Sequence, residues 1–254
     1  MRERAAPFAA RFDAVDALRG LAMVWMTVFH FCFDLTQFGY FKQDFYRDPI
    51  WTWQRTLILS LFLFCAGMGQ AIAVAQKQSW PRFWRRWGQV VGCALGVTAG
   101  SWLMYPQSFI YFGVLHGIAL MLIIVRLTTR WGGWLWGLGA MAMAMKFIVV
   151  YAIETSATAE FIHLLNASAL NWLGLITLKP ITEDYVPLLP WLGVMWWGVA
   201  AGTWLTRSGA ASMSWRLPPY FSPLVKIGRW SLSYYMLHQP VLIGALMLVG
   251  WLIQ

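Results

Sequence analysis

The residues of this sequence that could do chemistry collect on one face of its first apolar run. Arg19 and His30 are eleven positions apart, which on a helix of about 100° per residue leaves only about 20° between them around the axis. The rest of this polar stripe is Asp16, Thr27, Asp34 and Gln37. Ionisable groups in a membrane span cost several kcal/mol unless they line a cavity or have partners, so the stripe indicates a functional site. The alternative is a seam of hydrogen bonds between helices.

The two ends of the polar stripe suit different chemistry. The rise of a helix puts about 16 Å between Arg19 and His30, so Arg19 lies at one membrane boundary and His30 in the opposite half. Asp34, one turn beyond His30, is placed to accept a hydrogen bond from the imidazole and raise its basicity, a general-base arrangement. Arg19 could bind a phosphate, or it could extend to lipid head groups or pair with Asp16.

A second basic group lies in the run RFWRR, which contains Arg82, Arg85 and Arg86. A guanidinium group binds phosphate oxygens in pairs, and it would therefore suit the phosphates of coenzyme A. The excess of basic residues that membrane proteins carry in their cytoplasmic loops explains the run equally well.

Four further residues are candidates for a binding pocket. His116 lies between two glycines that would let a ligand or another helix approach. Tyr235 and His238 share a helix face near Pro240, which frees a carbonyl and kinks the helix. Asp184 comes before the apolar run 188–206, where a carboxylate is also favoured as a helix cap.

The composition predicts an all-α membrane protein. Of the 254 residues 59% are hydrophobic and 11% are charged, a balance outside that of ordinary soluble domains. Several runs of about 17 to 22 mostly apolar residues match the length of a membrane-spanning helix. Cys32, Cys65 and Cys93 lack the spacing of a disulfide framework or a metal site. The net charge of +9 lies in loops, so no nucleic-acid partner is expected.

The apolar runs predict one domain over 1–254, a polytopic helix bundle with seven transmembrane helices. We expect these helices at 17–37, 54–75, 88–104, 109–125, 131–152, 188–206 and 230–252, and an interfacial or re-entrant helix within 161–178. With a cytoplasmic N-terminus, the inner segments hold fourteen Lys and Arg residues and the outer segments four. The positive-inside rule therefore places the N-terminus in the cytoplasm and the C-terminus in the periplasm.

Five motifs in order resemble known membrane acyltransferases. The run DALRGLAMVWMTVFHF is similar to the first helix of the bacterial membrane O-acyltransferases, and Arg82 and Arg85 are spaced like their RxxR pair. The fuller resemblance is to small bacterial relatives of heparan-alpha-glucosaminide N-acetyltransferase. It rests on SLFLFCAGMGQAIA, FGVLHGIALML, DYVPLLPWLGV and IGRWSLSYYMLHQPV. The chain departs from the O-acyltransferases in having fewer expected helices, so an acceptor-binding part could come from a partner.

The resemblance implies an acyltransferase of the bacterial inner membrane. It would take an acetyl or other acyl group from cytoplasmic acyl-CoA to a hydroxyl or amine of a glycan or lipid at the outer side. His30 would be the general base or a transient acyl carrier oriented by Asp34, while Arg19, the RFWRR arginines and His238 would bind the acyl-CoA. Two other classes stay open: a haem- or metal-binding redox protein using the intramembrane histidines, and a proton-coupled transporter. A homodimer or an accessory subunit is also left open.

Overall fold

The computed structural model describes residues 12–156, 158–208 and 217–253, and every regular element in them is a helix. The long helices are α1 Asp13–Gln37, α2 Pro49–Ala75, α3 Trp80–Met104, α4 Val114–Thr128, α5 Trp134–Ser156, α7 Trp191–Arg207 and α9 Ser231–Ile253. Short helices are α6 Ala159–Leu165, α8 Ser222–Arg229, η1 Thr129–Trp131, η2 Asn171–Leu173 and η4 Pro219–Phe221. The expected all-α fold is confirmed.

A long helix occupies each of the seven positions where the sequence predicts one. Five segments are long and apolar enough to cross a membrane, namely α1, α2, α4 with η1, α5 and α9. The number of seven spans stays a prediction because α3 and α7 are not among these five. The segment 161–178 holds the end of α6, whose seven residues extend only about 10 Å and cannot cross a hydrocarbon core of roughly 30 Å.

Glycines bring the backbones of α2 and α7 into direct contact at the centre of the bundle. A Cβ added to Gly67 of α2 would lie 2.1 Å from the Met195 carbonyl oxygen, and one added to Gly198 of α7 would lie 2.1 Å from that of Phe64. Small residues at such a crossing are a common way of packing helices within a membrane. The largest core cluster surrounds this crossing, with Leu63, Met121, Met195 and Val199 fully buried.

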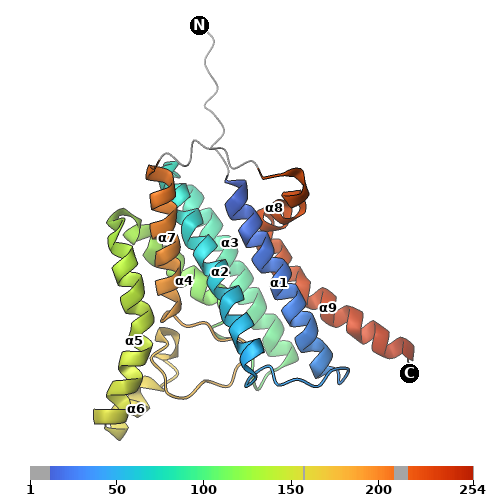
Figure 1. Cartoon of the computed structure of the whole chain (residues 1–254). Coiled ribbons are helices and arrows are strands. Elements are labelled where there is room, and N and C mark those ends of the chain that lie inside the picture. The colour runs from blue at the N-terminus through green and yellow to red at the C-terminus, as the bar shows by residue number, and fades with distance from the viewer. Residues whose placement is uncertain (1–11, 157, 209–216, 254) are drawn as a thin grey trace.

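A second close crossing joins α1 to the short helix α8. A Cβ on Gly20 would meet the Leu224 carbonyl oxygen at 2.0 Å, and one on Gly228 would meet the Asp16 carbonyl oxygen at 1.8 Å. Helix α9 follows α8, starts beside α1 and runs in the same direction, but its far end diverges from the bundle (Figure 1). The polar stripe of α1 is therefore held between α8 at one end and α9 along its length.

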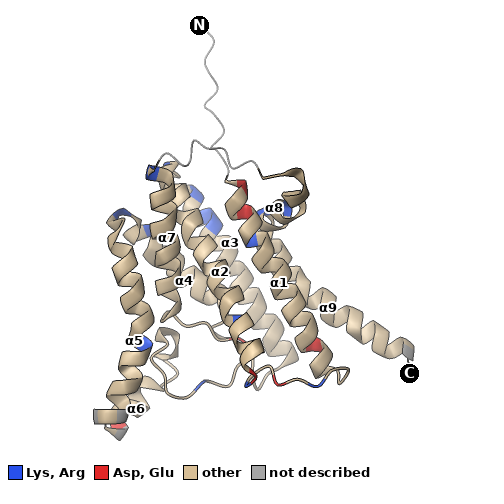
Figure 2. Cartoon of the chain, in the orientation of Figure 1, with Lys and Arg blue, Asp and Glu red and all other residues tan. Residues whose placement is uncertain are grey.

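Basic residues gather at the end of the bundle where α1 and α3 begin and α2, α4 and α7 end (Figure 2). This end corresponds to the cytoplasmic side in the expected orientation. Four of the residues that entered the charge comparison, Arg2, Arg4, Arg11 and Arg216, lie outside the described residues. We call this the arginine-rich end and the opposite one the far end.

Candidate active site

The polar stripe of α1 faces α9, and three side-chain pairs join the two helices at successive levels. The Thr27 and Tyr234 hydroxyls are 2.8 Å apart. One level further, the rings of His30 and His238 meet edge to face with centroids 5.2 Å apart. Beyond them, the Gln239 amide donates to both oxygens of the Asp34 carboxylate, at 2.8 and 3.0 Å. Part of the stripe is thus a hydrogen-bonded helix seam, as the alternative interpretation predicts.

The expected hydrogen bond from His30 to Asp34 is absent from the part of the chain that the structure describes. The Asp34 carboxylate is buried and is bound instead by Gln239. An i,i+4 spacing permits a contact on one helix, but a partner on a neighbouring helix competes for the same carboxylate. The sequence did not single out Gln239. The one feature that points to Gln239 as a site residue is its position next to His238 on a helix that contacts α1.

His238 combines one bound ring nitrogen with one free ring nitrogen. Its Nδ1 lies 2.7 Å from the Tyr235 carbonyl oxygen. Its Nε2 is buried and, within the described residues, has no hydrogen-bond partner. Leaving a buried polar atom unsatisfied costs about 1–3 kcal/mol. The sequence predicted a role in binding acyl-CoA for this residue, and the structure places it directly beside His30.

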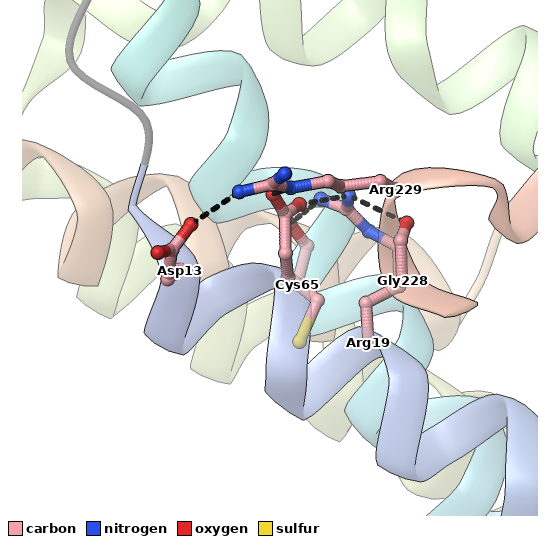
Figure 3. Close-up of polar contacts among 6 residues, drawn as sticks. Asp13, Arg19, Cys65, Gly228 and Arg229 are labelled. Carbon is pink, nitrogen blue, oxygen red and sulfur yellow. Dashed lines mark hydrogen bonds and ion pairs between the residues drawn. The ribbon is translucent and has the colours of Figure 1, made fainter. Parts of the chain in front are cut away.

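Ion pairs surround Arg19 where α1, α2 and α8 meet (Figure 3). Arg19 is 3.0 Å from the Asp16 carboxylate, so the pairing expected as the alternative to phosphate binding is present. It also donates to the carbonyl oxygens of Cys65, at 3.4 Å, and Gly228, at 3.5 Å. Arg229 of α8 contacts the carboxylates of Asp13, at 2.8 Å, and Asp16, at 3.7 Å. A second cation thus shares the acidic partner of Arg19.

Two adjoining cavities lie next to this ion-pair cluster. The first cavity has a volume of about 300 Å³ and is lined by Arg19, Arg86 and Arg229 together with Asp16. The second has about 250 Å³ and a mostly apolar lining that includes Phe62, Leu115, Ile118, Leu232 and Tyr235. Arg19, Gly69 and Arg86 line both cavities. Together they lead from a basic mouth to Tyr235, whose ring centroid is 5.6 Å from that of His238.

The RFWRR arginines have different positions. Arg86 lines both cavities and donates to Gln89 of its own helix at 3.2 Å. Arg82 and Arg85 are exposed and line neither cavity. The resemblance to the RxxR pair selected Arg82 and Arg85, whereas helix α3 turns the next residue, Arg86, toward Arg19. The sequence did not select Arg229 for the site either, because only the folding of α8 against α1 brings it there.

His116 lies in a different seam, between α3 and α4. Its Nε2 is 3.1 Å from the Thr98 hydroxyl, and its Nδ1 accepts a hydrogen bond of 3.3 Å from the Gly113 amide. Both ring nitrogens are therefore engaged in holding the start of α4. His116 thus has other partners than the neighbouring pair His30 and His238, and the described residues hold no cluster of three or more metal-ligating side chains.

Asp184 caps a different helix from the one the sequence indicates. Its carboxylate accepts a hydrogen bond of 2.7 Å from the Val114 amide, at the start of α4 and not of α7. The segment around it pairs with the chain before α4 through a bridge between Phe112 and Tyr185. Burial raises the pKa of Asp184 above that of an exposed carboxyl group, although this hydrogen bond acts in the other direction.

Lys179 and Tyr46 pair a charged with an aromatic side chain at the far end of the bundle. The Lys179 ammonium lies 5.4 Å from the centre of the Tyr46 ring, close enough for a cation–π contact. Burial, with Arg55 nearby, lowers the pKa of Lys179. These residues belong to the loops after α1 and before α7, and they give the far end a polar surface.

Sequence comparison identifies the family of this chain. The family model described as heparan-alpha-glucosaminide N-acetyltransferase, catalytic, matches residues 11–240. The chain therefore belongs to the heparan-alpha-glucosaminide N-acetyltransferase catalytic family, a class of acetyltransferases, and its long apolar helices are those of a membrane protein. No curated protein and no solved structure matches the chain. The match includes α1, both cavities and the α9 residues up to Pro240.

Proposed function

We propose that this protein is an acyltransferase of the bacterial inner membrane that takes an acetyl or related acyl group from acyl-CoA at the arginine-rich end. The observation that carries the proposal is the pair of adjoining cavities with a basic mouth and an apolar interior. Acyl-CoA has the same division, with anionic phosphates at one end and a long, weakly polar arm ending in the thioester. The family to which the chain belongs supports the same donor.

The mouth of the cavities is suited to the phosphates of coenzyme A. Arg19, Arg86 and Arg229 approach it from three different helices, α1, α3 and α8. Arginine binds phosphate with paired hydrogen bonds, and each bond to a charged group contributes about 1.5–3 kcal/mol. Asp16 now neutralises part of this charge, so phosphate would compete with Asp16 for the guanidinium groups.

The far part of the path is suited to the reaction. Tyr235 lines the second cavity and lies beside His238, which in turn faces His30. The arm of the donor would lie along the apolar wall and bring the thioester toward this histidine pair. We propose His30 as a general base or transient acyl carrier in the transfer, with Asp34 acting on the pair through Gln239 and not through His30 directly.

The acceptor in this proposal is a hydroxyl or amine on a glycan or lipid at the far end. The family description, which names an N-acetyltransferase of a glucosaminide, supports a glycan amine. The polar surface formed by Lys179 and Tyr46 lies at the end from which such an acceptor would approach. In the expected orientation this end is periplasmic, with the N-terminus in the cytoplasm.

Calorimetric titration of acetyl-CoA into the detergent-solubilised full chain tests the donor site. Arg86→Gln should weaken binding about 10- to 100-fold, because it removes a charge-assisted phosphate contact from the mouth of both cavities. The matched control is Arg130→Gln, which removes an exposed arginine of η1 that lines neither cavity. Equal affinity of wild type and Arg86→Gln would contradict the proposed donor site.

A further inference from the structure

We propose that His238, and not its neighbour His30, is the catalytic base that removes the proton from the acceptor, an inference that rests on the proposed acyl transfer. His238 and Gln239 carry buried hydrogen-bonding atoms, and the ring of His238 lies 5.6 Å, between centroids, from that of Tyr235, which lines the second cavity. In this proposal His238 has a role in the reaction itself, in place of the donor binding that the sequence predicts for this residue.

The hydrogen bond at Nδ1 determines which nitrogen of His238 carries the proton. A carbonyl oxygen can only accept a hydrogen bond, so Nδ1, 2.7 Å from the Tyr235 carbonyl, must be the protonated nitrogen. In a neutral imidazole the other nitrogen then holds a lone pair and can only accept. The backbone thus holds Nε2 of His238 in the form that a general base requires.

Two buried hydrogen-bond acceptors on consecutive residues lack partners. One is Nε2 of His238 and the other is Oε1 of Gln239, within the part of the chain that the structure describes. The orientation of the Gln239 amide follows from Asp34, because its NH2 group must face the carboxylate. Buried acceptors normally have a donor, so both atoms call for a ligand with O–H or N–H groups. A sugar or amino sugar has such groups, whereas the thioester carbonyl of the acyl-CoA has none.

The ring of His238 lies next to the path that we propose for the donor. Its ring stacks near Tyr234, with centroids 6.4 Å apart, and faces His30 at 5.2 Å. Tyr235, one helical turn before it, lines the second cavity. An acyl thioester that reaches Tyr235 and an acceptor bound at Nε2 would therefore meet at this level of α9.

The proposed step moves one proton and one acyl group. Nε2 takes the proton from the hydroxyl or amine of the acceptor as its oxygen or nitrogen forms a bond to the thioester carbonyl carbon. The tetrahedral intermediate then collapses, the carbon–sulfur bond breaks, and the electron pair leaves on the coenzyme A sulfur. The imidazolium of His238 returns its proton to this thiolate, which gives acylated acceptor, coenzyme A and neutral histidine.

The protonation state of His238 can be measured without any substrate. Nitrogen-15 spectra of the full chain in micelles, labelled at its histidines, distinguish the two neutral ring forms, and His238→Asn identifies the signals of His238. We expect the form with the proton on Nδ1. A proton on Nε2 would overturn the assignment, whether or not the protein transfers acyl groups.

Turnover of acetyl-CoA with a glucosaminide as the acceptor tests the step itself. His238→Asn keeps an N–H group near the Tyr235 carbonyl but lacks the base, so turnover should fall about 10²- to 10⁴-fold while acetyl-CoA affinity stays unchanged. His238→Ala should lose as much turnover as His238→Asn, and added imidazole should restore part of the rate. The control His163→Asn changes an exposed histidine of α6 and should keep the wild-type rate.

The outcomes separate this inference from the proposed function. Wild-type turnover in His238→Asn would remove the base role and leave the acyltransferase proposal intact. A lower rate that comes with weaker acetyl-CoA binding, without rescue by imidazole, would give His238 a structural role and overturn the inference. Binding of acetyl-CoA without any transfer by the wild type to the glucosaminide would count against the proposed amine acceptor, whereas the ring form of His238 would still test the base.

Discussion

Two polar seams cross this bundle, and they differ in whether their hydrogen bonds are complete. In the α3–α4 seam, both ring nitrogens of His116 are bound, one to Thr98 and one to the Gly113 amide. In the α1–α9 seam, His238 and Gln239 each bury an acceptor atom that has no partner among the described residues. Both seams place a histidine in an apolar helix, yet only the second leaves hydrogen-bonding capacity for a ligand.

The difference shows how a structural histidine can be distinguished from a functional one. An unsatisfied buried acceptor destabilises the empty protein by about 1–3 kcal/mol, so it persists where something else supplies the partner. A fully bonded histidine stabilises the fold and has no free nitrogen for chemistry. Substitutions in the α1–α9 seam should therefore reduce activity, and those in the α3–α4 seam should reduce stability.

The largest effect is expected at His30, the partner of His238 across the α1–α9 seam. If His30, rather than His238, is the base, or if His30 carries the acyl group, His30→Ala should lower acyl transfer about 10²- to 10⁴-fold, and the melting temperature should change little. Asp34→Asn should reduce turnover less, because Asp34 bonds to Gln239 and not to His30. Wild-type turnover of purified His30→Ala would place His30 outside the reaction.

A smaller loss is expected at Arg19, which lies on the same polar stripe of α1 but at the arginine-rich end, where α8 contacts it. Arg19→Gln should weaken acetyl-CoA binding by roughly 1.5–3 kcal/mol if the guanidinium contacts phosphate, as calorimetric titration can measure. If the ribose phosphate is the partner of Arg19, replacing coenzyme A by dephospho-CoA should reduce the binding affinity less in the variant than in the wild type. Unchanged affinity with a lowered melting temperature would mean that Arg19 serves only its ion pair with Asp16 and its bonds to α2 and α8.

In the α3–α4 seam the expected loss is one of stability. His116→Ala should lower the free energy of unfolding by about 1–3 kcal/mol, because it leaves the Thr98 hydroxyl and the Gly113 amide without this partner. Turnover per folded molecule should stay at the wild-type rate. Thermal unfolding and an activity assay on the same preparation check both parts. A stable variant with lost turnover would move His116 into the active site and erase the contrast between the seams.

The sequence predicted the helices and the polar stripe, but not the partners of that stripe. The long apolar runs predicted where α1, α2, α5 and α9 lie, and helical spacing predicted that Arg19 and His30 share one face. The pairing of Asp34 with Gln239, and the arrival of Arg229 at Arg19, depend on how α9 and α8 pack against α1. No local pattern encodes such contacts between residues about 200 positions apart, because they result from packing of the whole bundle.

The smallest effect concerns Asp184, which caps α4 at the outer end of the α3–α4 seam. Burial raises the pKa of this carboxyl group in the folded protein. The folded state therefore binds more protons than the unfolded chain, in which an aspartate has a pKa of about 3.9. The stability that protonated Asp184 provides is present below that value and is lost as the pH rises through the higher pKa of the folded state.

Asp184→Asn should weaken this pH dependence without removing the cap, since the asparagine side-chain oxygen can still accept the hydrogen bond from Val114. Thermal unfolding in detergent at a series of pH values from about 4 upward should show a melting temperature that falls less in the variant than in the wild type. Asp184→Ala, which loses both the charge and the cap, should be less stable than Asp184→Asn throughout. If Asp184→Asn matches the alanine variant instead, the negative charge itself holds the start of α4. The α3–α4 seam would then depend on the electrostatic attraction of Lys179 and Arg55 for this carboxyl group, in addition to its hydrogen bonds.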